Sequence, residues 1–432
     1  MARPQERTVA QSRRPAEPIG TATRRASLRL LDAVLRRGEA LEAALPAATR
    51  AIHGPDRALA HAIAAETLRR LPDLDALIDD ATRQRLPDDA KARMALRIAL
   101  AQALSLGTPP HAAIATILPL VDGGPKRLVH GVFGAVMRGG AHLPDVPTLP
   151  GEVAARWTAA WGEAVVGGIA RAIAAPPPLD LTLRDPAKTE EWAAQLGGDS
   201  LLPGHLRLRE REAVADLPGY AEGAWWVQDI AASLPARLLG PGPGSVVDVC
   251  AAPGGKTLQL AAAGWQVTAL DIAAPRLERF AANLARTGLH AETICADALA
   301  WNPPAPLDAV LLDAPCSASG IVRRHPDVMY RARPDIVAEM AGLQRQLLAR
   351  AADWVRPGGR LVYATCSLEP AEGEKQVAAL LAARDDYTVA PIATPLPPGI
   401  VPSAEGWLRL TPALLPDQGG CDGFFMASLV RR

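Results

Sequence analysis

The sequence predicts three structural regions: an all-helical N-terminal domain, a small α+β subdomain and a doubly wound α/β domain. The 432 residues exceed one ordinary core, because domains average about 150 residues. Apolar residues recur every three to four positions in the first third of the chain, which is typical of amphipathic helices. From residue 241 onward strands and helices alternate, which is typical of a parallel sheet covered on both faces.

The helical domain is expected over residues 21–143. It follows a polar, arginine-rich arm over residues 1–20 that we expect to be disordered. Leu28, Leu31 and Leu35 illustrate the helical spacing, and segments that contain proline, in most cases with glycine, separate the periodic stretches. A proline-rich joint ends the domain.

The α+β subdomain is expected over residues 151–240 and the α/β domain over residues 241–432. In the subdomain the pattern predicts one helix near 153–175 and a short strand at 179–183. The α/β domain is expected to contain a parallel sheet and a closing antiparallel pair. Its predicted strands are 245–250, 266–271, 291–295, 307–313 and 360–366, with 407–410 and 423–430 as the closing pair.

Composition excludes several classes of protein. No apolar run of about 18 residues occurs, so we expect no transmembrane helix. The five cysteines form no Cys-x-x-Cys pair and the eight histidines are scattered, so we expect no metal site and free thiols in a reducing, cytoplasmic compartment. The net charge of zero gives no sign of nucleic-acid binding, although residues 1–30 carry seven arginines, which either contact phosphates or form a solvated tail.

A glycine turn follows the first strand of the α/β domain and precedes a helix. In such sheets ligands bind at the carboxyl ends of the strands. Gly254 and Gly255 lie at this position, and residues without a Cβ atom allow the backbone to approach a ligand closely. The turn is neither a dinucleotide fingerprint nor a phosphate loop, so alone it is weak evidence for a site.

Acidic residues at successive strand ends strengthen this interpretation. Asp271 lies 23 residues after Asp248, near the spacing of about 20 at which an acid reaches a ribose. Asp297 follows the third strand, and Asp313 ends the fourth. The sequence offers four carboxylates but no phosphate-binding loop. This combination favours a cofactor with a cationic adenosyl sulfonium over a nicotinamide dinucleotide. Each aspartate alone is equally well explained as a helix or turn cap.

Two cysteines follow predicted strands and precede a serine. Cys316 lies three residues after Asp313, and Cys366 ends the fifth strand. If these strands are neighbours, both thiols face one pocket. Carbon 5 of a pyrimidine reacts with a methyl donor only after a thiolate adds at carbon 6, and an acid such as Asp313 favours that addition. Either cysteine alone is better explained as a buried apolar residue, so the pair is the informative feature.

At these residues the sequence resembles the Sun-type RNA cytosine-5 methyltransferases, among them the enzymes of bacterial 16S rRNA. The N-terminal domain resembles their NusB-like RNA-binding domain, including Asp56-Arg57 and residues 110–113. The other matching segments are 227–229, 248–257, 313–320, 323–327, 365–367 and 422–425. The resemblance implies a class I, Rossmann-like methyltransferase domain that uses S-adenosyl-L-methionine.

The resemblance also implies roles for individual residues. Cys366 is expected to be the nucleophile, Cys316 to assist breakdown of the covalent intermediate, and Asp313 to support the chemistry. Cofactor contacts are expected from Asp271, Asp297 and Asp313, and from the loop residues Cys250, Ala251, Ala252, Pro253, Gly254, Gly255 and Lys256. Lys256 has this role only through the resemblance.

The sequence therefore predicts a monomeric enzyme that methylates carbon 5 of a cytosine in 16S rRNA. Two alternatives stay open: the same chemistry on tRNA, or an RNA-binding assembly factor without catalysis. Arg323, Arg324 and His325, just after the loop that carries Cys316, are expected to contact phosphate and guide the base, or else to form a solvated turn.

Overall fold

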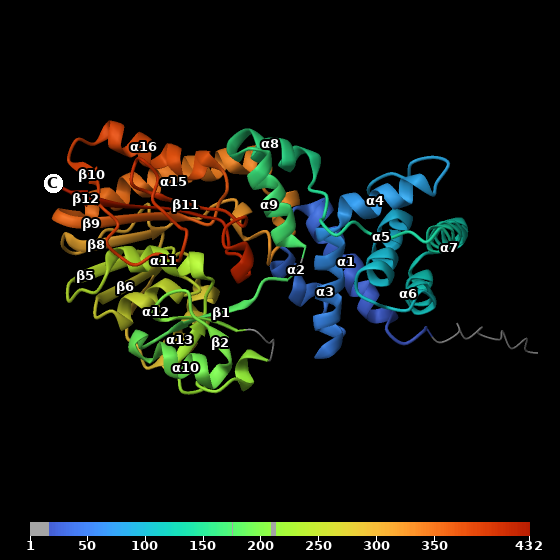
Figure 1. The fold of residues 1–432 in the computed structure, drawn as a ribbon, viewed down its shortest axis with the longest axis horizontal. Coiled ribbons are helices and arrows are strands. Elements are labelled where there is room, and N and C mark those ends of the chain that lie inside the picture. The colour runs from blue at the N-terminus through green and yellow to red at the C-terminus, as the bar shows by residue number, and fades with distance from the viewer. Residues whose placement is uncertain (1–16, 175, 209–212) are drawn as a thin grey trace, which may run out of the picture. The chain divides into compact units, whose positions relative to one another are not determined.

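The computed structural model describes residues 17–174, 176–208 and 213–432. The chain divides into two compact units, Met1–Leu143 and Pro144–Arg432 (Figure 1). The expected disordered arm lies almost entirely outside the described residues.

The first unit is helical, as predicted. Its helices pack through small and aliphatic side chains, with Leu30 of α1, Ile63 of α3 and Leu100 of α5 fully buried. The helices are α1 (Thr21–Arg37), α2 (Leu41–Ala48), α3 (Pro55–Arg69), α4 (Leu71–Asp80), α5 (Lys91–Leu104), α6 (Pro110–Ile117) and α7 (Gly123–Arg138).

Buried ion pairs join α4 to α5 in this unit. The Arg93 side chain is fully buried, and its guanidinium donates to Asp79 at 2.5 and 3.0 Å and to Asp75 at 3.1 Å. Arg97 donates to both carboxylate oxygens of Asp75 at 2.7 Å. A buried guanidinium needs such partners, because an unpaired buried charge is costly.

The second unit begins with two helices and an antiparallel sheet. The single helix predicted near 153–175 is wrong: α8 (Gly151–Trp161) and α9 (Glu163–Ile173) are separated by Gly162, whose φ of 81° is in the region that favours glycine. The sheet has the order β2-β3-β1-β4. Its elements are β1 (Leu179–Leu183), α10 (Thr189–Leu196), β2 (Gly198–Asp199), β3 (His205–Leu208) and β4 (Trp225–Val227).

The large sheet confirms the predicted α/β class. Its order is β10-β12-β9-β8-β5-β6-β7, with β11 paired to β12. The pairs from β9 to β7 are parallel, and the predicted closing pair is present as antiparallel β11 and β12. The strands are β5 (Ser245–Val249), β6 (Gln266–Asp271), β7 (Glu292–Cys295), β8 (Leu307–Asp313), β9 (Val355–Thr365), β10 (Tyr387–Val389), β11 (Leu408–Leu410) and β12 (Phe424–Arg431).

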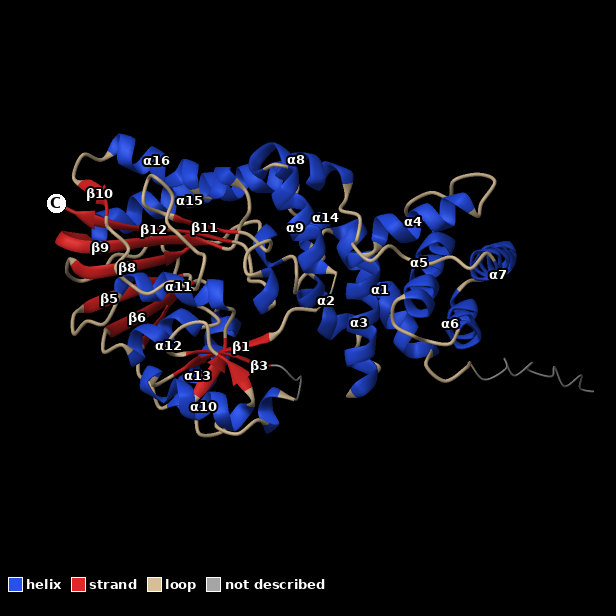
Figure 2. Ribbon diagram, in the orientation of Figure 1, coloured by secondary structure: helices blue, strands red, loops and turns tan. Residues whose placement is uncertain are grey.

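Helices cover both faces of this sheet (Figure 2). Alternate strand residues face opposite ways, so Leu311 packs with the α11 side while Leu312 packs with the α15 side. This two-sided burial explains why the central strands β5 and β8 are mostly apolar. The helices are α11 (Ile230–Leu239), α12 (Gly255–Ala262), α13 (Ala274–Thr287), α14 (Val328–Arg331), α15 (Pro334–Trp354) and α16 (Glu374–Ala383).

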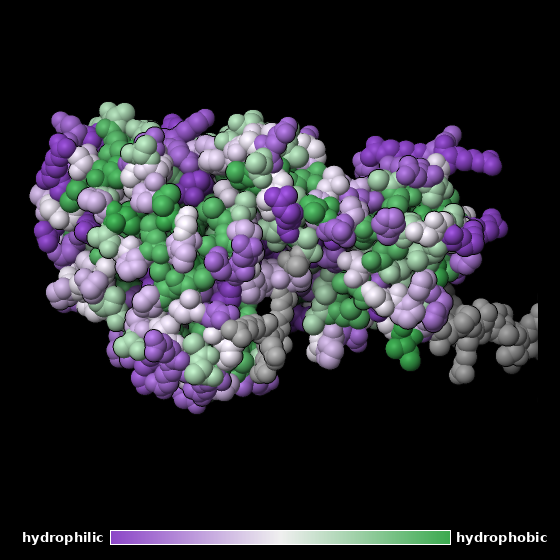
Figure 3. Space-filling model, viewed as in Figure 1, coloured by the Kyte–Doolittle hydropathy of each residue, from purple (hydrophilic) through white to green (hydrophobic). Residues whose placement is uncertain are grey.

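Hydrophilic side chains are spread over the face of both units shown in Figure 3. Among the described residues, no helix combines the length and apolar character needed to cross a membrane.

The Arg93 cluster generates a testable prediction about stability and pH. The hydrogen bond from Arg93 lowers the pKa of Asp79, so the pair stabilises the fold at neutral pH and loses its effect as pH falls below about 4. Asp79→Asn should lower the free energy of unfolding at pH 7 by about 1–2 kcal/mol, less than for a fully buried pair because Asp79 is partly exposed.

Denaturant titrations of the full chain at pH 7 and pH 3 measure this effect. The difference between wild type and Asp79→Asn should shrink at pH 3, because the Asp79 carboxyl of the unfolded chain binds a proton below about pH 4 and the folded state then loses part of its advantage. The exposed neighbour Asp80 gives the matched control, Asp80→Asn, which should change stability little at either pH. An equal loss at both pH values would contradict the prediction.

Candidate active site

The predicted site residues meet at the carboxyl edge of the large sheet. The loop Cys250–Gly254 connects β5 to α12, and Asp271 ends β6. Asp313 ends β8, and Cys366 directly follows β9. Because parallel strands end at the same edge, these loops lie side by side.

The two predicted thiols lie next to each other. Strands β8 and β9 pair in parallel, with Asp313 opposite Ala364, and the Sγ atoms of Cys316 and Cys366 are 3.4 Å apart. The hydrogen bond with Cys366, burial and the nearby negative charge of Glu372 together raise the pKa of Cys316 well above its ordinary value. Cys316 therefore stays a protonated thiol at neutral pH.

Lys256 and Asp313 form an ion pair beside the thiols. The Lys256 Nζ and the Asp313 Oδ2 are 2.5 Å apart, and Nζ also lies 5.2 Å from the centroid of the Phe424 ring. Burial lowers the pKa of Lys256, but the charge and hydrogen bond of Asp313 and the charges of Asp248 and Cys366 raise it by more. The lysine is therefore an ammonium at neutral pH.

Asp271 holds the glycine loop in place. Its buried carboxylate accepts hydrogen bonds from the backbone N–H groups of Ala252 at 3.1 Å and Ala273 at 2.9 Å. Gly254 has a φ of 103°, and a Cβ atom there would lie 2.0 Å from the Phe280 ring. The glycine is thus required by both conformation and space.

The other predicted cofactor residues have different surroundings. Asp297 is exposed, and its carboxylate accepts from the Leu299 N–H at 2.9 Å. Burial and the charges of Asp313, Asp271 and Asp248 raise the pKa of Cys250 to about 12, so this cysteine is an unreactive thiol.

Ile272 is a residue that our sequence reasoning missed. Its side chain is 68% exposed although it is a large apolar residue at the end of β6. Its backbone oxygen accepts from the Cys295 Sγ at 3.7 Å, which places it beside the β7 edge. The sequence feature that could have identified Ile272 is its position as an aliphatic residue directly after Asp271, the last residue of the strand.

A cavity of about 570 Å³ opens beside the ion pair. Its size falls in the range of small-molecule sites. Asp313 and Lys256 line one part, and Tyr220, Trp226 and His325 line others. It therefore combines charged groups at the sheet edge with aromatic rings from the smaller sheet and its loops.

The prediction that Arg323 contacts phosphate is wrong, and so is the alternative of a solvated turn. Arg323 is 1% exposed, and its guanidinium lies 3.8 Å from Asp422 and 4.0 Å from Asp229. Arg324 donates to the same two carboxylates at 3.2 and 2.9 Å. Arg324 and His325 line the cavity, whereas Arg323 belongs to the buried support beneath it.

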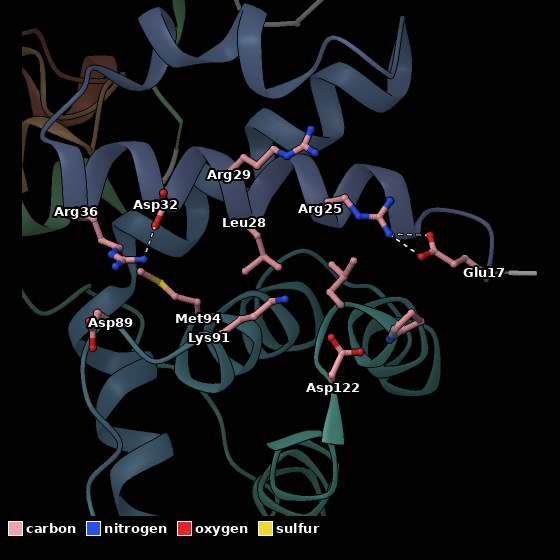
Figure 4. Close-up of a pocket in the computed structure, with 12 residues that line it drawn as sticks. Glu17, Arg25, Leu28, Arg29, Asp32, Arg36, Asp89, Lys91, Met94 and Asp122 are labelled. Carbon is pink, nitrogen blue, oxygen red and sulfur yellow. Dashed lines mark hydrogen bonds and ion pairs between the residues drawn. The ribbon is translucent and has the colours of Figure 1, made fainter. Parts of the chain in front are cut away.

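A second cavity, of about 510 Å³, lies in the helical unit (Figure 4). Its charges are mixed in sign: Arg36 pairs with Asp32 at 3.1 Å and Arg25 pairs with Glu17 at 2.6 Å. The lining residues include no cysteine, serine or histidine. Across the described part of the chain, no group of three or more histidine, cysteine or acidic residues is placed to hold a metal ion.

Both units match known protein families. Residues 237–430 match the model of the 16S rRNA methyltransferase RsmB/F family, and residues 21–138 match the NusB family. Ribosomal RNA small subunit methyltransferase B of Xanthomonas campestris pv. campestris is 34% identical over 435 residues, which cover 95% of this chain and 98% of that protein.

Solved structures share the fold. The crystal structure of PH0851 has a TM-score of 0.72 at 24% identity and covers 97% of this chain and 100% of that one. The methyltransferase homologue from Pyrococcus horikoshii has a TM-score of 0.54 at 28% identity, covering 64% of this chain and 94% of that one.

The buried Asp248 beneath the glycine loop generates a second prediction. Burial raises its pKa to about 7; Oδ2 accepts from the Thr257 hydroxyl at 2.6 Å, whereas no described residue bonds Oδ1. The folded state therefore binds more protons than the unfolded state between about pH 4 and pH 7, and stability falls as pH rises through that window.

Asp248→Asn removes this dependence. The variant should be more stable than wild type at pH 8 and nearly equal at pH 5, as measured by thermal unfolding of the full chain. The exposed Glu278 of α13 provides the control variant Glu278→Gln, for which no such crossover is expected. A constant difference between pH 5 and pH 8 would argue against a neutral Asp248.

Proposed function

Because the chain belongs to the 16S rRNA methyltransferase RsmB/F family, we propose that it methylates carbon 5 of a cytosine in 16S rRNA through a covalent cysteine adduct, with S-adenosylmethionine as donor. The observation that carries this proposal is the pair of thiols 3.4 Å apart beside the Lys256–Asp313 ion pair. Two thiols at one pyrimidine suit a reaction in which one bonds carbon 6 and the other assists its release.

The residues at the sheet edge fit the proposed cofactor. Asp271 and Asp313 place carboxylates where a cationic sulfonium and a ribose can bind. The exposed Ile272 offers an apolar surface for a purine ring, a role that no sequence motif had assigned. When bound, S-adenosylmethionine supplies an electrophilic methyl group.

Cys366 is the proposed nucleophile. Cys316 has a pKa well above its ordinary value and stays protonated, which leaves Cys366 as the thiol of the pair that is proposed to form the bond. The Cys366 thiolate adds at carbon 6, and the electrons of the 5,6 double bond make carbon 5 nucleophilic. Asp313, at the end of β8, accepts a hydrogen bond from the exocyclic amine and orients the base.

Cys316 is proposed to act at the end of the cycle. After carbon 5 has gained the methyl group it loses its proton to a base, and the bond from carbon 6 to the Cys366 sulfur breaks to restore the double bond. The neighbouring Cys316 thiol can donate a hydrogen bond to that sulfur as negative charge returns to it. This arrangement suits release of the methylated RNA.

RNA binding is proposed for both units. The helical unit matches the NusB family, and the cavity beside the Lys256–Asp313 ion pair offers Tyr220 and His325 for contact with bases. A cytosine must leave its helix to reach the thiols, and an aromatic cavity stabilises such an extruded base.

Variants of the two cysteines separate their roles. Cys366→Ala should abolish both methyl transfer and the covalent protein–RNA adduct. Cys316→Ala should accumulate the adduct as a slowly migrating band on a denaturing gel, because release is impaired. Cys421→Ala is the matched control, since this buried thiol donates to the Thr411 oxygen at 3.6 Å and does not line the cavity. If Cys366→Ala instead accumulates the adduct, the two roles are exchanged.

The substrate is tested with purified RNA. Wild-type protein and labelled S-adenosylmethionine should methylate 16S rRNA, and bisulfite sequencing should place the label at a cytosine. Purified tRNA serves as the comparison substrate. Labelling of tRNA alone would reject the rRNA assignment, and label at a base other than cytosine would reject the proposed chemistry.

A further inference from the structure

A buried carboxylate lies behind the two thiols and has no part in the proposed chemistry. Glu372 follows Cys366 by six residues, at the end of the short turn Pro370–Glu372, and is 0% exposed. Burying a carboxylate is costly unless hydrogen bonds satisfy it. Its partners therefore indicate what it does.

The carboxylate oxygens of Glu372 accept hydrogen bonds from the two cysteine loops, which follow β8 and β9 and carry Cys316 and Cys366. Oε2 accepts from the hydroxyl of Ser317 at 2.5 Å and from the hydroxyl of Ser367. Oε1 accepts from the backbone N–H of Ser317 at 2.8 Å and from Gln344 Nε2 at 3.2 Å. Ser317 and Ser367 directly follow Cys316 and Cys366, so one carboxylate joins both loops.

Glu372 is itself held from two sides. Its backbone oxygen accepts from the Tyr363 hydroxyl at 2.8 Å and the Thr365 hydroxyl at 3.2 Å, both on β9. Gln344 of α15 also donates to the Pro315 oxygen at 2.8 Å, just before Cys316. The carboxylate is thus anchored to β9, to α15 and to both loops.

The geometry assigns to Glu372 the role of a positioning residue: through Ser317 and Ser367 it holds the two cysteine loops at the spacing at which their thiols meet. This inference rests on the proposed function of the thiols. Charge-assisted hydrogen bonds to a carboxylate are about twice as strong as neutral ones, so Glu372 can impose this spacing more firmly than serine contacts alone.

The charge of Glu372 supports the same role. The groups that act on the Cys316 thiol by charge or by hydrogen bond include Cys366, Glu372, the Ala318 backbone and the buried Tyr363. The contact with Cys366, burial and the charge of Glu372 raise the pKa of Cys316, and the Ala318 backbone opposes them. The carboxylate therefore both fixes Cys316 and keeps it a thiol.

Steady-state kinetics of Glu372→Gln test the positioning role in the full chain. The amide preserves size but provides one acceptor oxygen for four donors. We expect kcat for RNA methylation to fall about 10- to 100-fold with KM for RNA and cofactor unchanged within about twofold, because thiol alignment and not substrate binding is disturbed.

Glu369→Gln is the matched control. Its carboxylate is also buried in the same loop, but it accepts from Trp157 Nε1 at 3.0 Å and from Arg156 and bonds to neither serine. The Glu369 backbone N–H donates to the Ser367 hydroxyl at 3.0 Å, and the substitution leaves that bond in place. It should lower the melting temperature and leave kcat per folded molecule near wild type. An equal loss of kcat in both variants would overturn the inference.

Serine variants give an independent test if Glu372→Gln folds poorly. The double variant Ser317→Ala with Ser367→Ala should reproduce the kcat loss, and adding Glu372→Gln should cause little further loss, because the groups act as one unit. Additive losses would contradict a shared positioning role.

Alkylation by iodoacetamide separates this inference from the proposed function, since it needs neither RNA nor cofactor. Peptide mass spectrometry should show Cys316 labelling more slowly than Cys366 in wild type. In Glu372→Gln the ratio of Cys316 to Cys366 labelling should rise, because a negative charge has been removed from beside Cys316. An unchanged ratio would refute the role of Glu372 even if methylation proceeds. A raised ratio in a protein that methylates no cytosine would refute only the proposed function.

Discussion

Parallel pairing of β8 with β9 is the constraint on which the active-site geometry depends. The register places Asp313 opposite Ala364, so the next residues of both strands leave the sheet together. Cys316 and Cys366 meet because their loops start from adjacent positions, and a shift of the pairing by one residue would turn side chains to the opposite face of the sheet. The central, two-sided burial of these strands fixes that register, since Leu311 and Leu312 each pack into a different layer.

A group of buried charged side chains lies next to the carboxyl edge of the large sheet. Asp229 begins α11, Asp422 precedes β12, and Arg324 bridges them. Asp180 of the smaller sheet pairs with Arg207 at 2.7 Å and accepts from the Ile230 N–H at 3.0 Å, so the smaller sheet is tied to the start of α11. Breaking one member would leave buried charges unpaired, which is far more costly than losing a surface ion pair.

The class of fold and the meeting of the two thiols could be predicted from sequence because both depend on local patterns. Alternating strands and helices define the sheet, and a cysteine directly after a strand must lie at its carboxyl edge. The burial of Arg323 could not be predicted, because its partners Asp229 and Asp422 are almost a hundred residues away in the chain. The role of Glu372 could not be predicted because Glu369, Glu372 and Glu374 lie close together in the chain with no pattern that distinguishes them. Only the packing of the folded chain shows which carboxylate faces the serines. The roles of Cys366 and Cys316 came from family resemblance, and they stay predictions.

The order of the strands also explains where the Lys256–Asp313 ion pair lies. From β5 the chain adds β6 and β7 on one side and β8 and β9 on the other, so the pair spans the topological switch point of the sheet. The helix after β5 packs on the same face of the sheet as α11, whereas α15, which follows β8, packs on the opposite face. The two connections therefore leave the sheet in opposite directions, and a crevice forms between them without any additional loop. The crevice divides the edge into a half with Asp271 and the glycine loop and a half with the thiols. A methyl group passing from one half to the other would cross at this ion pair.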